Sequence, residues 1–198
     1  MNTIENTKHI KLRAQTNDTW VQTIMTDFDT FLLDHASCER KASAMAMSMV
    51  AHYPDKTDLV MAMTDLAIEE LAHFKQVLKH ITARNLILAP DTKDPYIQAI
   101  RKHIRNGKDD YFLDRLLTAG IIEARGHERF SIVAENLEPG PIQTMYAIIA
   151  KAEAKHHQLF VDLAKKYFSQ DIVYARLDYL LDKEAEIVNS LDHRVALH

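Results

Sequence analysis

The chain has 198 residues, which is enough for one domain with a sizeable hydrophobic core and for two domains at most. Its formal net charge of −4 gives no global electrostatic reason to expect nucleic-acid binding, so any such binding needs a local basic patch. Only 4 glycines and 5 prolines accompany 47% hydrophobic residues, a composition that favours helices over a turn-rich β fold.

Three features of the sequence bear on its location. No apolar run approaches the roughly 18 residues that a membrane-spanning helix needs, so we expect no membrane association. Residues 1–12 are polar and lack the apolar core of a secretory signal. The single cysteine, Cys38, cannot form an internal disulfide. Together these features predict a cytoplasmic protein.

Helical periodicity runs through most of the chain and is interrupted by capping residues, prolines and glycines. Residues 1–16 are predicted to be an N-terminal lead-in with little regular structure, and residues 17–198 a single domain. In chain order, the predicted helices span about 17–25, 26–53, 57–84, 95–105, 109–136, 141–168 and 170–190.

The connections between the four long helices predict their topology. A turn at residues 54–56 and a sharp break at residues 139–141 are short, so each should join two antiparallel helices. The middle connection, about 25 residues long, allows the chain to cross along the bundle. The expected fold is all-α: a ferritin-like four-helix bundle with one long crossover connection and additional short and C-terminal helices.

Two Glu-x-x-His pairs carry the chemistry of the sequence: Glu70 with His73, and Glu153 with His156. Residues three apart share one face of a helix, so each pair can bind a single metal ion. Two such pairs, with one further glutamate from each of two other helices, form the ligand set of di-iron and di-manganese bundles.

Glu39 and Glu123 are the two further glutamates. Glu39 lies about 14 residues before the end of its helix and Glu70 about 12 residues after the start of the next, roughly 21 and 18 Å from the same turn. The two side chains should therefore meet at one height, and Glu123 and Glu153 repeat the arrangement in the second half of the chain. The alternative is a set of solvated charges, but the apolar neighbours of these positions favour burial, which would be costly for four unpartnered carboxylates.

The residue types narrow the choice of metal, since a carboxylate-rich site with one imidazole per ion suits iron or manganese better than zinc. Cys38 points about 100° away from Glu39 on the helix, so it is not expected to be a ligand. Glu69 is a candidate acceptor for a ligand histidine, and Glu128 is interpreted as a surface charge. For His127, lining the site and ordinary packing both stay open.

Gly120 and Gly126 lie on either side of Glu123 in a predicted helix, where a glycine costs about 1 kcal/mol relative to alanine. One interpretation is close packing between helices. The other is functional: the glycines make room for a substrate or permit a π-bulge that redirects Glu123. The sequence does not distinguish them.

The sequence around the metal motif resembles that of the tRNA 2-methylthio-N6-isopentenyladenosine hydroxylase family over about residues 17–190. The similarity is carried by four segments, which are residues 34–42, 69–74, 122–130 and 153–160. The resemblance implies a non-haem di-iron monooxygenase that hydroxylates the isopentenyl group of the modified adenosine beside the tRNA anticodon. It places the ligands of two iron ions on Glu39, Glu70, His73, Glu123, Glu153 and His156. It also implies dioxygen and an external reductant as co-substrates, with tRNA and an electron-transfer protein or reductase as partners.

A surface for tRNA is less clearly marked. The best basic stretch lies on the crossover connection, where phosphate contacts would give a salt-dependent affinity; it consists of Arg101, Lys102, Arg105 and Lys108. A solvated helix face explains the same residues equally well.

Two other functions stay open at this point. One is a different ferritin-like di-iron oxidase or hydroxylase, and the other is a non-enzymatic protein that stores iron or scavenges peroxide. Storage predicts a shell-forming oligomer, whereas hydroxylation predicts a monomer or a small homo-oligomer with an open route to the metal ions.

Overall fold

The computed structural model describes residues 10–198, so residues 1–9 of the expected lead-in lie outside the described part. Within residues 10–198 all regular secondary structure is helical. The helices in chain order are α1 (Asp18–Thr26), α2 (Phe28–His52), α3 (Thr57–Ala83), α4 (Pro95–Arg101), α5 (Lys108–Asn136), α6 (Pro141–Tyr167) and α7 (Gln170–Ser190).

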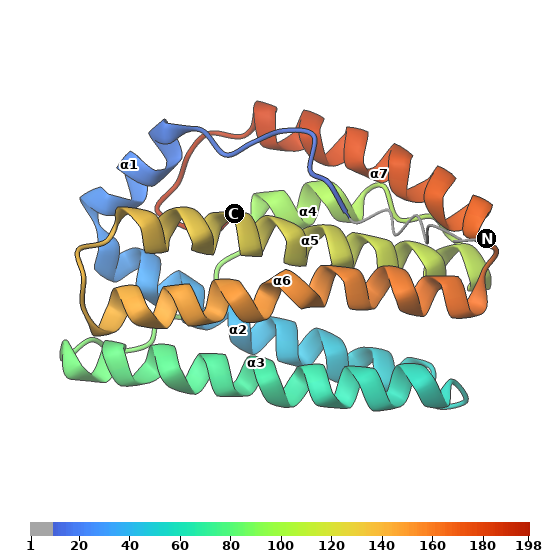
Figure 1. Ribbon diagram of the computed structural model, residues 1–198, viewed down its shortest axis with the longest axis horizontal. Coiled ribbons are helices and arrows are strands. Elements are labelled where there is room, and N and C mark those ends of the chain that lie inside the picture. Colours follow the sequence, from blue (N-terminus) through green and yellow to red (C-terminus); the bar gives the residue numbers. More distant parts are fainter. Residues whose placement is uncertain (1–9) are drawn as a thin grey trace, which may run out of the picture.

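The long helices α2, α3, α5 and α6 run along the long axis of the molecule and form the bundle (Figure 1). Short turns join α2 to α3 and α5 to α6 as two antiparallel hairpins, and these hairpins meet along α3 and α6. The connection between them contains α4, and α7 packs against α4 and α5 on the outside of the bundle (Figure 1). The predicted all-helical bundle with one crossover is thereby confirmed. Among the described residues, no helix is long and apolar enough to cross a membrane.

The helix ends follow from local capping chemistry. The side chain of Asn17 accepts a hydrogen bond from the backbone of Trp20 at the start of α1, and Asp27 accepts one from Thr30 at the start of α2. Asp94 caps α4, which has Pro95 in its first turn, where a missing N–H costs nothing. The two caps at Asn17 and Asp27 explain why α1 and α2 are separate helices.

The prediction that the short helix reaches residue 105 is wrong, because α4 ends at Arg101. The next amides, up to Ile104, bond to carbonyls three residues back, which tightens the backbone. The amide of Arg105 then donates to Asp114 Oδ2 on α5 at 2.8 Å instead of continuing the helix. The Asp114 carboxylate therefore binds the backbone N–H of Arg105, where the sequence alone suggested more helix.

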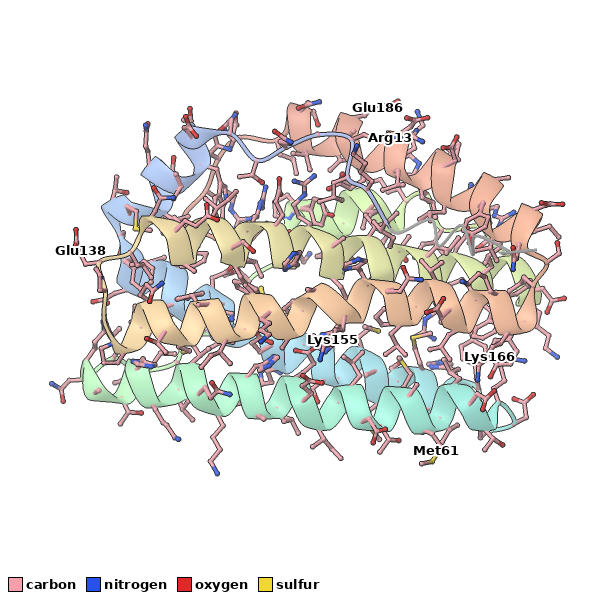
Figure 2. The ribbon with its side chains drawn as sticks, viewed as in Figure 1. Arg13, Met61, Glu138, Lys155, Lys166 and Glu186 are labelled. Atoms are coloured by element: carbon pink, nitrogen blue, oxygen red, sulfur yellow. The ribbon has the colours of Figure 1, made fainter. Side chains whose placement is uncertain are left out.

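Residues 10–16 have no helix, but they are not loose. Ile10 and Ala14 are buried, and Arg13 forms ion pairs with Asp178 and Asp182 on α7. Figure 2 shows Arg13 beside α7. Residues 10–16, called the strap below, therefore hold α7 on the bundle. The prediction of little regular structure is therefore confirmed for residues 10–16, although these residues pack closely against the rest of the protein.

The interpretation of Glu128 as a surface charge is also wrong. Its carboxylate accepts hydrogen bonds from the backbone N–H and the hydroxyl of Thr16, both at 2.8 Å. It also pairs with the buried guanidinium of Arg125, which bonds to the fully buried Glu184 on α7 at 2.8 Å. This polar network fastens the strap and α7 onto the back of α5.

The hydrophobic core consists of two clusters, one on each side of a polar layer. In α2, Phe31 and Ala36 before Glu39 belong to one cluster, and Ala46 and Met49 after it belong to the other. The other long helices show the same division. The bundle therefore presents a band of polar side chains at one depth, between two dry regions.

Candidate metal centre

The six predicted ligands come from four helices and are all buried: Glu39 on α2, Glu70 and His73 on α3, Glu123 on α5, and Glu153 and His156 on α6. Glu123 is the most exposed of them, at 8%. In Figure 2, Lys155 marks their depth along α6, because it lies between Glu153 and His156 in the sequence. The structure thus brings together every residue of the predicted ligand set.

The donor atoms form two groups that share two carboxylates. One group is Glu39, Glu70, His73 and Glu153, and the other is Glu70, Glu123, Glu153 and His156; within each group the atoms lie within 4.8 Å of one another. Glu70 and Glu153 belong to both groups. This sharing is the arrangement expected of two neighbouring metal positions bridged by two carboxylates.

Each histidine directs its Nδ1 atom at the carboxylates. The Nδ1 of His73 lies 3.2 Å from Glu153 Oε1 and 3.4 Å from Glu70 Oε2. The Nδ1 of His156 lies 2.8 Å from Glu153 Oε2 and 3.2 Å from Glu70 Oε1. Each imidazole therefore contacts the glutamate of its own helix and that of the facing helix.

Crowding shifts the protonation of these groups away from ordinary behaviour. Burial raises the pKa of Glu70 to about 7 and raises that of Glu123 well above its usual range. Burial acts on Glu153 too, but the close contacts with His156 and His73 outweigh it and lower its pKa. Burial disfavours the charged histidines, yet their carboxylate partners raise the pKa of His73 to about 12 and that of His156 to about 11. Bound protons therefore supply the positive charge that metal ions would bring to this site.

A metal ion is the group that these residues fit. Several buried donor atoms that face one another have no hydrogen-bond partner, among them Glu70 Oε1, His73 Nδ1 and Glu153 Oε1. Unsatisfied buried polar atoms are rare in folded proteins and cost about 1–3 kcal/mol each, so a group of them indicates a binding site for a cation. Two divalent cations would balance the charge of the four carboxylates.

His35 and Tyr146 belong to the site, and the sequence analysis missed them. His35 is fully buried, with Nε2 at 2.5 Å from Glu39 Oε1 and Nδ1 at 2.9 Å from the Tyr146 hydroxyl. Burial lowers the pKa of His35 to about 3, so the ring is neutral. The spacing of His35 four residues before Glu39 was the available signal, since such residues share a helix face.

The other candidates for the site have separate positions. A carboxylate oxygen of Glu69 lies 3.3 Å from His156 Nε2, but no hydrogen bond joins them, so its role as an acceptor stays a prediction. Cys38 belongs to neither donor group and contacts Asp34 at 3.8 Å. His127 bonds to the carbonyl of Ala150 at 2.7 Å, so it ties α5 to α6 rather than lining the centre.

The two glycines of α5 have different surroundings. A Cβ atom on Gly120 would lie 3.1 Å from Ile10 Cδ1, 3.1 Å from Phe160 Cβ and 3.2 Å from the carbonyl of His157. Close packing therefore accounts for Gly120. On Gly126 the same atom would meet only the Phe130 ring, at 3.8 Å, so packing does not require glycine there. Since α5 is a continuous α-helix, there is no π-bulge beside Glu123.

The basic stretch on the crossover divides into free and engaged residues. Arg101, Lys102 and Lys108 are exposed. Arg105 instead forms a fork with Asp114, at 2.8 and 3.0 Å, and a further ion pair with Asp110 at 2.8 Å. Its charge is therefore largely neutralised within the protein.

Together, the bundle and its buried carboxylate–histidine cluster define a protein of the ferritin-like class with a candidate two-metal centre. The model of the family described as "tRNA-(MS[2]IO[6]A)-hydroxylase (MiaE)" matches residues 3–198. The chain belongs to this family.

Two relatives support the assignment, and both carry the name tRNA 2-(methylsulfanyl)-N(6)-isopentenyladenosine(37) hydroxylase. The protein from Pseudomonas putida is 32% identical over 187 residues, which cover 94% of this chain and 91% of the relative. The protein from Salmonella typhimurium is 32% identical over 165 residues, which cover 83% of this chain and 60% of the longer relative.

A solved structure shows the same fold. It is described as protein 43 with aldehyde deformylating oxygenase activity from Synechococcus, and it is 34% identical to this chain. The two structures superpose with a TM-score of 0.89 over 96% of each chain. The ferritin-like fold is therefore shared with an oxygenase of a different described activity.

Proposed function

We propose that this protein is a non-haem di-iron monooxygenase that hydroxylates the isopentenyl group of 2-methylthio-N6-isopentenyladenosine next to the tRNA anticodon. The observation that carries the proposal is the pair of buried donor groups sharing Glu70 and Glu153, in a chain of the hydroxylase family. A carboxylate-rich set with one imidazole per group favours iron or manganese, and the family favours iron.

The residues of the centre have distinct tasks in this proposal. Glu70 and Glu153, which belong to both donor groups, would help to hold both iron ions, while Glu39 with His73 would complete one position and Glu123 with His156 the other. Two iron ions held there would supply the oxidising power to insert one atom of dioxygen into a C–H bond, while two external electrons and two protons convert the other atom to water. The apolar clusters on either side keep bulk water away from the buried ligands.

The substrate and the reductant imply partners. We expect tRNA as the macromolecular substrate, and an electron-transfer protein or reductase as the source of electrons. We also propose that the protein acts in the cytoplasm as a monomer or small homo-oligomer. In a shell-forming assembly, a folded RNA would have poor access to the centre.

A nucleoside analysis tests the proposal. Reduced, iron-loaded protein is incubated with dioxygen and tRNA carrying the prenylated adenosine, and the tRNA is digested and analysed by mass spectrometry. The expected product is the same nucleoside with one added oxygen atom. Glu70→Gln should give no product, because it removes a bridging carboxylate, whereas Asp65→Asn at an exposed position of α3 should behave as wild type.

The similarity to the Synechococcus protein favours a second candidate function, the oxidative removal of the formyl group of an aldehyde. The same iron-loaded preparation can be supplied with aldehydes of graded chain length in place of tRNA. An aldehyde-derived product together with unmodified tRNA would transfer the assignment to this function. Turnover of tRNA alone would exclude it.

A further inference from the structure

The two halves of the centre repeat their ligands but not the surroundings of those ligands. Glu39 in the α2–α3 hairpin corresponds to Glu123 in the α5–α6 hairpin, and each precedes a Glu-x-x-His pair. Four residues before Glu39 the chain has His35, and four residues before Glu123 it has Ala119. One of the two equivalent carboxylates therefore has an imidazole on the preceding helical turn, and the other has a methyl group.

The imidazole of His35 is held in one orientation. It has no exposed surface, and aromatic rings from three helices surround it. The ring centroids of Phe130, Tyr146 and Phe31 lie 4.5, 5.2 and 6.4 Å from its own. Rotation of the ring would break its bonds to Glu39 and Tyr146 together, so its two nitrogen atoms keep their partners.

This orientation fixes one oxygen of Glu39. When Glu39 is ionised, the single N–H of the neutral imidazole donates from Nε2 to Glu39 Oε1, and Nδ1 accepts the hydroxyl proton of Tyr146. The other oxygen, Oε2, faces His73 Nδ1 at 3.7 Å and stays available to a metal ion. Glu123 faces His156 Nδ1 at 3.9 Å, and the turn before it carries Ala119, which has no donor.

We propose that His35, held by Tyr146, is a positioning residue that fixes Glu39 and makes the metal position at Glu39 and His73 the tighter of the two. The inference rests on the metal centre of the proposed function. Its physical basis is that an outer hydrogen bond holds a ligand in its binding orientation, and loss of such a bond typically weakens metal binding about 10–100-fold. The less supported position, at Glu123 and His156, is then the one that loads second.

A titration of metal-free protein with Co²⁺ tests this inference, because Co²⁺ resists oxidation and its visible absorption reports the ligands of each ion. Wild type should bind two ions with separable affinities. His35→Leu keeps an apolar side chain among the rings but removes the donor, so the tighter step should weaken about 10–100-fold. His35→Gln retains an N–H donor and should recover most of the loss. Tyr146→Phe keeps every ring contact and should weaken the same step to a smaller degree.

The matched control is His127→Gln, since His127 is a half-buried histidine of the same bundle that bonds a backbone carbonyl and not a ligand side chain. Its titration should match wild type. Unchanged affinities in His35→Leu would overturn the inference, and so would equal losses in His35→Leu and His35→Gln, because only packing would then matter. If His35→Leu fails to fold, an unchanged titration of Tyr146→Phe has the same force. Failure of wild type to bind two ions would instead overturn the proposed centre itself.

Discussion

Protons and metal ions compete for the same buried side chains of the centre. In the metal-free protein, burial raises the pKa of Glu70 from 4.5 to about 7. Burial opposes the charging of His73, but its carboxylate partners raise the pKa of that imidazole from 6.5 to about 12. Both groups bind protons more tightly in the folded chain than in the unfolded chain. Their contribution to stability is therefore complete at low pH and is lost as pH rises through the folded-state pKa.

We predict that the metal-free protein becomes less stable as the pH rises from about 5 to 8. Over this range Glu70 and the two histidines lose their protons at a lower pH in the unfolded chain than in the folded chain. Glu153, whose pKa is lowered, acts only below about pH 4.5. His35, whose pKa is lowered from 6.5 to about 3, acts in the opposite direction below about pH 6.5, but the raised pKa values of three glutamates (Glu39, Glu70 and Glu123) outweigh it. Metal ions bind deprotonated ligands, so the gain in Tm on adding Mn²⁺ should grow over the same window. Thermal melts with and without Mn²⁺ measure both trends. A metal-free Tm that rises steadily from pH 5 to pH 8 would contradict the prediction.

At the scale of helices, α5 packs tightly against its neighbours at Gly120. A methyl group there would meet the side chain of Ile10, the Cβ atom of Phe160 and the backbone carbonyl of His157. The last two are fixed to the backbone of α6 and cannot rotate away. At Gly126, six residues later on the same helix, the same methyl group would make only an ordinary contact of 3.8 Å with the Phe130 ring. The two glycines thus offer a matched pair of substitutions.

We predict that Gly120→Ala destabilises the protein by about 1–3 kcal/mol, because α5 and α6 must separate to admit the methyl group. Gly126→Ala should be neutral or stabilising by up to about 1 kcal/mol, since alanine favours the helix and meets no close atom. Chemical denaturation of both variants gives the comparison. Equal stability of the two would show that the contact at Gly120 is not tight.

The elements that the sequence predicted best are those with a local cause. Helical periodicity, short turns and the repeated Glu-x-x-His pairs are set by neighbours within a few residues, so the four long helices and the ligand depth were predictable. The end of α4 depends on a bond between Arg105 and Asp114, 9 residues apart, and the half-buried position of Glu128 depends on Thr16, 112 residues away in the chain. Such long-range contacts leave no periodic signal. Tyr146 escaped notice for the same reason, since its hydroxyl finds His35 across 111 residues.

At the scale of the whole molecule, the net charge of −4 opposes the approach of tRNA. The exposed Arg101, Lys102 and Lys108 lie on the crossover and the start of α5, on the opposite side of the bundle from α3 (Figure 1). Lys108 precedes Glu123 by 15 residues of helix, about 22 Å along the axis. A folded RNA is large enough to contact this surface while a modified base reaches the centre.

We predict that Arg101→Glu combined with Lys102→Glu weakens tRNA binding and makes the affinity less dependent on salt concentration. Each lost phosphate contact reduces the number of counterions that binding releases. Arg105 should be left intact, since its fork with Asp114 holds the end of α4 and its reversal would disturb the fold. The matched control is Lys75→Glu with Lys79→Glu, an equal change of charge at exposed positions of α3. Binding isotherms at several salt concentrations, with metal content measured in parallel, separate a local contact from a general effect of charge. Equal losses in both double variants would mean that only net charge matters, and an unchanged affinity in the first would place the tRNA surface elsewhere.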